Sequence, residues 1–130
     1  MLRSLLEIDS VAGIKEGSWE VKAYECTRRI AREMRPEVAV MASGDEHLLA
    51  CFLIGSDGSA VSLAAVLPEL IVALDRRVRA GDFAKALEIH TVLFDFARLV
   101  YGATGDGAFI AGVASESPAA RAGLTRGTVI

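Results

Sequence analysis

The chain has 130 residues, of which 52% are hydrophobic and 24% charged, a composition that indicates a folded domain and excludes a disordered protein. Seventeen acidic residues against fourteen basic ones give a net charge of −3, so no basic surface for nucleic-acid phosphates is expected. No apolar run approaches the roughly 18 residues of a membrane helix, and the first residues lack a signal-peptide pattern. We therefore expect a cytoplasmic protein that binds neither nucleic acid nor membrane.

No metal site is expected either. Cys26 and Cys51 lack the CxxC spacing of a zinc site, and His47 has no second histidine four residues later.

The first part of the chain alternates apolar runs with amphipathic segments. Residues 11–15 form a short apolar run and predict a buried strand that ends on Lys15. Apolar residues recur at spacings of three and four from residue 21 to 34, which predicts an amphipathic helix. Residues 38–42 predict a second strand, and Asp45 is expected to cap the short helix that follows.

The next part of the chain repeats this order. A turn at residues 55–58 precedes a third predicted strand at residues 59–63, which is weaker because its residues are small and partly polar. Pro68 opens a helix that ends at Gly81. Asp82 is then expected to cap a long apolar helix over residues 83–101.

Three strands, each followed by a helix, predict an α/β fold with a parallel sheet and right-handed crossovers. In such folds ligands bind at the carboxyl ends of the strands. The candidate residues at these ends are Lys15, Glu16, Ser43, Gly44, Asp45, Glu46 and Ser62.

Lys15 has the strongest functional signal, because an apolar strand rarely ends on an ammonium group unless that end opens into a polar site. A lysine in a partly desolvated pocket loses preference for its charged form, and its free amine can attack a ketone to form a Schiff base. The alternative is a strand-end lysine that pairs with Glu16 or Glu46. Spacing alone leaves both interpretations open.

Several short motifs resemble one known family. They are residues 11–16 (VAGIKE), 42–46 (ASGDE), the turn at 55–58 (GSDG) with the strand after it, and the helix junction at 80–82. In this order and spacing they resemble the dihydrodipicolinate synthase and N-acetylneuraminate lyase superfamily. The resemblance covers residues 5–103 and implies the last three β/α units of a (β/α)8 barrel, or TIM barrel, with part of its carboxyl-terminal helices.

The resemblance also implies an activity. Lys15 matches the family's Schiff-base lysine, which implies a class I aldolase or lyase that binds pyruvate or a related 2-oxo acid as an imine. Carbon–carbon bond formation to an aldehyde, or the reverse cleavage, then needs no cofactor. The resemblance places substrate-binding residues at Ser43, Gly44, Asp45, Glu46, Ala60 and Ser62. For Asp45 the alternative role is the helix cap. Ala65 and Trp19 depart from the residues that are commoner in the family.

The resemblance divides the chain into a barrel portion, residues 1–103, and an atypical tail, residues 104–130, whose last 25 or so residues resemble part of a PDZ domain. A complete barrel needs about 250 residues and eight strands. We therefore expect a fragment that has negligible aldolase activity by itself and that associates with further copies as a homo-oligomer. The alternative function is an inactive remnant that serves, if at all, in self-association or protein interaction.

Overall fold

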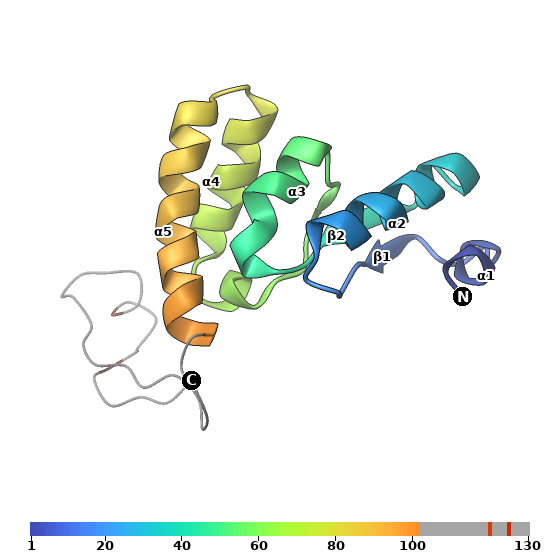
Figure 1. Ribbon diagram of the computed structural model, residues 1–130, viewed down its shortest axis with the longest axis horizontal. Coiled ribbons are helices and arrows are strands. Elements are labelled where there is room, and N and C mark those ends of the chain that lie inside the picture. Colours follow the sequence, from blue (N-terminus) through green and yellow to red (C-terminus); the bar gives the residue numbers. More distant parts are fainter. Residues whose placement is uncertain (102–119, 121–124, 126–130) are drawn as a thin grey trace.

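The computed structural model describes residues 1–101, 120 and 125. Residues 1–101 form one layer of strands packed against helices (Figure 1). The tail predicted at residues 104–130 lies outside the described residues, apart from those last two positions. The elements in chain order are α1 (Leu2–Leu6), β1 (Gly13–Lys15), α2 (Val21–Met34), β2 (Ala39–Ala42), the 3-10 helix η1 (Asp45–His47), α3 (Leu48–Ile54), β3 (Gly58–Ser59), the 3-10 helix η2 (Ser62–Ala65), α4 (Pro68–Arg79) and α5 (Phe83–Tyr101).

The three strands form a parallel sheet in the order β1-β2-β3. Lys15 pairs with Met41, and Met41 pairs with Gly58, so the carboxyl ends of the three strands lie at one edge of the sheet. Parallel neighbours need a crossover connection, and here α2 and α3 provide the two crossovers. The predicted α/β class and parallel sheet are confirmed.

The third strand is shorter than predicted. Residues 59–63 were expected to be extended, whereas β3 covers only Gly58–Ser59, and Ser62–Ala65 turn into η2. The ladder continues for one further bond, from the Ala60 amide to the Ala42 carbonyl at 2.9 Å. The chain then bends because the Leu63 amide donates to the Asp45 carboxylate at 2.7 Å instead of to a neighbouring strand.

The two faces of the sheet have different surroundings. Val40 and Ala42 are fully buried in the core that α2 and α3 help to form. The register places Gly13, Lys15, Ala39, Met41 and Gly58 on the other face, where residues are exposed or only half-buried. In a (β/α)8 barrel the helices form the outer ring, so the face without helices corresponds to the barrel interior.

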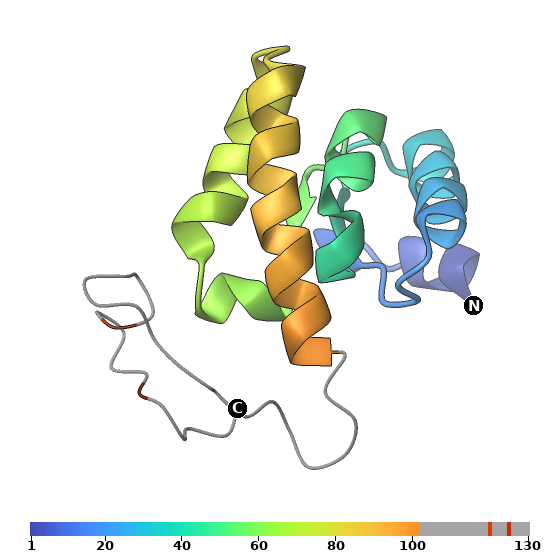
Figure 2. The same cartoon turned by 60° about the vertical axis from the view of Figure 1, so that its left-hand side comes forward.

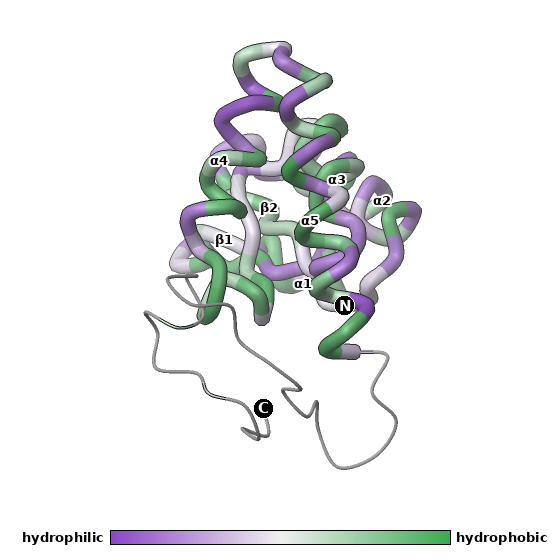
Figure 3. Tube along the Cα trace, turned by 90° about the vertical axis from the view of Figure 1, so that its left-hand side faces the viewer, coloured by the Kyte–Doolittle hydropathy of each residue, from purple (hydrophilic) through white to green (hydrophobic). Residues whose placement is uncertain are grey.

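The two carboxyl-terminal helices lie side by side and form a hairpin (Figure 2). Gly81 takes a left-handed conformation (φ 73°) at the turn between them, and the Lys85 amide donates to the Asp82 carboxylate at 3.3 Å, which confirms the predicted cap. Figure 3 shows polar and apolar stretches alternating along α4 and α5, as expected for helices buried on one side. Among the described residues, no helix has the length and apolar character needed to cross a membrane.

Tyr24 connects α2 to the sheet from within the core. Its side chain is 1% exposed, and its hydroxyl donates to the Val40 carbonyl at 3.1 Å. Replacing Tyr24 with phenylalanine removes only this donor, and Ser56 still donates to the same carbonyl at 3.3 Å. We expect the free energy of unfolding to fall by about 1 kcal/mol in urea titrations. A loss above about 3 kcal/mol would contradict this assignment.

Candidate active site

Lys15 is the last residue of β1 and lies on the sheet face that lacks helices. Its side chain is exposed and makes no hydrogen bond or ion pair within the described part of the chain. The pairing with Glu16 or Glu46 is therefore not observed. Glu16 instead accepts from the Ser18 amide and hydroxyl, both at 3.0 Å, and Glu46 pairs with Arg98 at 3.7 Å. The described residues leave the ammonium group in solvent, so the desolvated pocket expected around it is not formed by them.

Ser43 and Gly44 follow β2 at the same edge of the sheet. Ser43 is 5% exposed, and its Oγ has no hydrogen-bond partner among the described residues. A buried hydroxyl normally has a partner, so this orphaned group is a candidate for ligand binding. Gly44 takes a left-handed conformation (φ 81°), and a Cβ added there would lie 3.4 Å from the Cα of Trp19. The glycine therefore lets the loops after β1 and β2 approach closely.

Asp45 does not cap a helix, contrary to the sequence prediction. Gly44 and His47 occupy the capping positions of η1 and α3, and neither helix has a side-chain cap. Asp45 is 1% exposed: its Oδ1 accepts from the Leu63 amide and its Oδ2 from the Tyr101 hydroxyl, both at 2.7 Å. Both oxygens of this carboxylate are therefore used to join segments of the protein.

The remaining predicted residues lie after β3 or beside Asp45. Ala60 is half-buried, and its amide extends the sheet ladder. Ser62 is the first residue of η2 and is exposed, rather than lying on a strand as predicted. Because Asp45 binds the amide of Leu63, the loop after β2 and the segment at residues 60–63 lie together. The structure thus gathers the predicted residues at the carboxyl edge of the sheet.

Two aromatic residues at this edge were not predicted as site residues. The rings of Trp19 and Tyr101 are in edge-to-face contact, with centroids 5.0 Å apart and planes at 67°. Burial raises the pKa of the Tyr101 phenol, and the carboxylates of Asp45 and Glu46 act in the same direction, whereas a side-chain hydrogen bond with Ser62 partly offsets the rise. The sequence singled out Trp19 only as a departure from the residue that is commoner in the family. It did not indicate that the end of a distant helix would contact this tryptophan.

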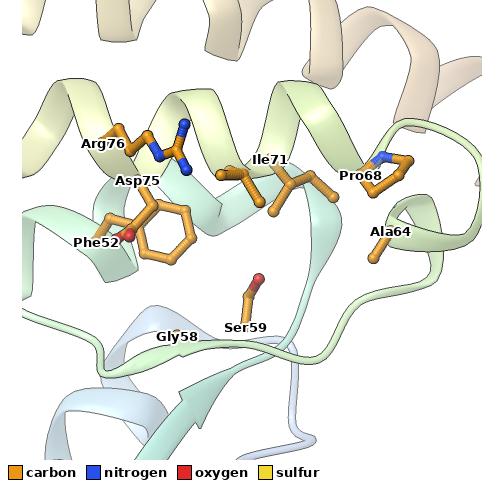
Figure 4. A pocket seen from close by; sticks show the side chains of 9 residues that line it. Phe52, Gly58, Ser59, Ala64, Pro68, Ile71, Asp75 and Arg76 are labelled. Atoms are coloured by element: carbon orange, nitrogen blue, oxygen red, sulfur yellow. The ribbon is translucent and has the colours of Figure 1, made fainter.

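A pocket of about 270 Å³ lies elsewhere, between α3, α4 and the start of β3 (Figure 4). Phe52 and Ile71 provide much of its apolar wall, and Ser59 points into it. The register places Ser59 on the same sheet face as the buried Ala42, the face opposite to Lys15. None of the predicted site residues lines this pocket, so it is separate from the candidate active site.

Parallel strands with helices on one face, and polar side chains at the carboxyl ends of those strands, define part of a (β/α)8-barrel protein. The sequence matches the Dihydrodipicolinate synthetase family over residues 1–110, and the chain belongs to this family. The family contains lyases, as its named relatives show.

One relative is a probable 2-dehydro-3-deoxy-D-pentonate aldolase of Escherichia coli, which is 32% identical over 91 residues, covering 70% of this chain and 30% of the relative. Among solved structures, the dihydrodipicolinate synthase of Thermotoga maritima superposes with a TM-score of 0.71 at 22% identity, covering 80% of this chain and 35% of that one. An E. coli prophage protein of the family, solved in complex with pyruvate, gives a TM-score of 0.69 at 25% identity, covering 75% and 33%. These superpositions confirm the partial barrel.

The chain spans about a third of the length of the relatives that it matches. Three strands cannot close a barrel, because the fold requires eight.

Proposed function

We propose that this chain is the carboxyl-terminal part of a class I aldolase or lyase, and that Lys15 forms a Schiff base with pyruvate or a related 2-oxo acid. The main support is the position of Lys15, which ends β1 on the sheet face that corresponds to the barrel interior. Its side chain is exposed and unpaired within the described residues. The pyruvate complex of the E. coli relative supports the choice of a 2-oxo acid.

The chemistry follows from the amine of Lys15. The neutral amine adds to the keto carbon to give a carbinolamine, which takes up one proton and loses one water molecule to give an iminium ion. The iminium draws electrons from the neighbouring carbon, which loses a proton to become an enamine. This carbon then attacks an aldehyde, whose oxygen takes up a proton to become a hydroxyl. Water hydrolyses the new iminium, which releases the product and one proton and restores the neutral amine. Carbon–carbon cleavage is the same sequence in reverse and needs no cofactor.

The substrate side of the proposed site is formed by Ser43, Gly44, Glu46, Ala60 and Ser62, with Asp45 holding the loops that carry them. The Oγ of Ser43 is buried and has no partner in the part of the chain that the structure describes, so it is available to a substrate oxygen. Asp45 contributes by position, because protein donors already occupy both of its oxygens.

We expect the chain by itself to form the adduct on Lys15, whereas turnover of an aldol requires additional polypeptide around this residue. We propose that residues 1–103 form the last three β/α units of a barrel and that five further units, in the same or another polypeptide, cover the exposed sheet face. Desolvation by those units would favour the neutral amine that the reaction needs. Residues 104–130 are proposed as a separate tail with no part in this chemistry.

A second candidate function is that of an inactive remnant that serves in self-association or protein interaction. This function needs no chemistry at Lys15. The uncovered sheet face and the exposed apolar residues of α5 favour it: Phe83, Leu87, Val92 and Leu99 are each more than half exposed. If a homo-oligomer covers these surfaces, light scattering should show an apparent molecular mass that increases with protein concentration.

Trapping with sodium borohydride tests the proposed chemistry. After incubation with pyruvate and borohydride, peptide mass spectrometry should find one reduced pyruvate on Lys15. Lys22 and Lys85, the other two lysines, are internal controls because each lies on a helix and neither ends a strand of the sheet. No adduct, or adducts of equal frequency on all three lysines, would contradict the Schiff-base proposal and leave the interaction function.

A further inference from the structure

Trp19 has a strained backbone conformation in the loop between β1 and α2, four residues after Lys15. Its φ of 65° lies in the left-handed region, and within the described residues it is the only residue other than glycine with a positive φ. This conformation costs a residue with a side chain roughly 1–2 kcal/mol. Such strain persists only where the surrounding structure holds it, and it concentrates at functional sites.

Two neighbouring residues make this conformation of Trp19 possible. On one side, the absence of a side chain at Gly44 leaves room for the Trp19 backbone. On the other, the Tyr101 ring packs edge-on against the indole. The indole remains 41% exposed, so it is fixed by these contacts rather than by full burial.

Tyr101 is in turn fixed by its hydroxyl. The hydroxyl donates to Asp45 Oδ2, while Asp45 Oδ1 accepts from the Leu63 amide. One connected group therefore joins the segments after β1, β2 and β3 to the last residue of α5. Figure 2 shows the end of α5 beside η2 and the start of α3, as these contacts require.

We propose that Tyr101 is a positioning residue for Lys15, and this inference rests on the proposed function. Glu16, the residue next to Lys15, donates its amide to the Met41 carbonyl at 3.1 Å, and the loop then runs to Trp19. By fixing Trp19, Tyr101 sets the path of this loop and with it the direction in which Lys15 leaves the end of β1. The carboxyl-terminal helix thus controls the geometry of the reacting amine without touching the substrate.

Trp19 is the only tryptophan of the chain, so its fluorescence reports this contact directly. In the full chain, pyruvate should produce a saturable change in Trp19 emission with the same concentration dependence as the adduct on Lys15. Tyr101→Phe keeps the ring but removes the donor to Asp45. We expect its emission without pyruvate to shift to longer wavelength and its rate of adduct formation at saturating pyruvate to fall at least about tenfold.

Leu99→Ala is the matched control, because Leu99 lies on the same helix and is 65% exposed. It should leave both the emission and the adduct rate unchanged. If Tyr101→Phe does not fold, Trp19→Gly decides, since glycine accepts the left-handed backbone while removing the indole. That variant should also form the adduct at least about tenfold more slowly.

The outcomes separate the two proposals. An adduct in the wild-type chain that forms at the same rate in folded Tyr101→Phe, or in Trp19→Gly where that variant decides, overturns the positioning role alone. No adduct in the wild-type chain overturns the Schiff-base proposal and the positioning role with it. Slower adduct formation with wild-type circular dichroism, together with the altered emission, supports both.

Discussion

Replacing Asp45 with alanine is expected to lower the free energy of unfolding by about 3 kcal/mol. The change leaves the buried Leu63 amide without an acceptor and also frees the Tyr101 hydroxyl. Hydrogen bonds to a charged group contribute about 1.5–3 kcal/mol each, and an unpartnered buried donor has a comparable cost. Urea titrations followed by circular dichroism would measure the loss.

Glu46→Gln is the control for this change, because it alters the neighbouring carboxylate and its ion pair with Arg98 but no hydrogen bond of Asp45. A pair of this kind near the surface contributes at most about 1 kcal/mol. The Asp45→Ala and Tyr101→Phe changes should also be non-additive, because both remove the same hydrogen bond. Equal losses for Asp45→Ala and Glu46→Gln would show that Asp45 does not join the loops.

Replacing Lys15 with arginine is expected to abolish the pyruvate adduct completely. Arginine retains the positive charge, but its guanidinium stays protonated at any accessible pH and cannot add to a ketone. Because Lys15 is exposed and its side chain makes no hydrogen bond or ion pair in the described part of the chain, the free energy of unfolding should change by less than about 0.5 kcal/mol. Peptide mass spectrometry after borohydride reduction checks the first effect and urea titration the second.

Lys22→Arg provides the matched comparison, since Lys22 lies at the start of α2 rather than at the end of a strand. It should form the adduct on Lys15 at the wild-type rate. Persistence of the pyruvate adduct in Lys15→Arg would show that another lysine carries the reactive amine. That result would contradict the proposed site.

The order of elements could be predicted from the sequence because each has a local cause. The spacing of apolar residues predicts α2 over Val21–Met34, and the structure has these bounds. Pro68 at the first turn and Gly81 after the last one predict α4. The third strand is different: small residues gave a weak signal, and the distant carboxylate of Asp45 turned the chain into η2.

The candidate site was predictable only in part, because some of its contacts join segments that are distant in the sequence. Because the carboxyl ends of parallel strands share one edge, the sequence already placed Lys15 and Ser43 together. A carboxylate after a strand is equally suited to cap a helix or to accept distant donors, so the role of Asp45 depended on which groups folding brought to it. The sequence by itself therefore determined the parallel sheet, its helices and the edge on which Lys15 lies. Only the tertiary structure decided that Tyr101, 56 positions away from Asp45, joins the loops of that edge, because contacts between distant segments leave no local pattern.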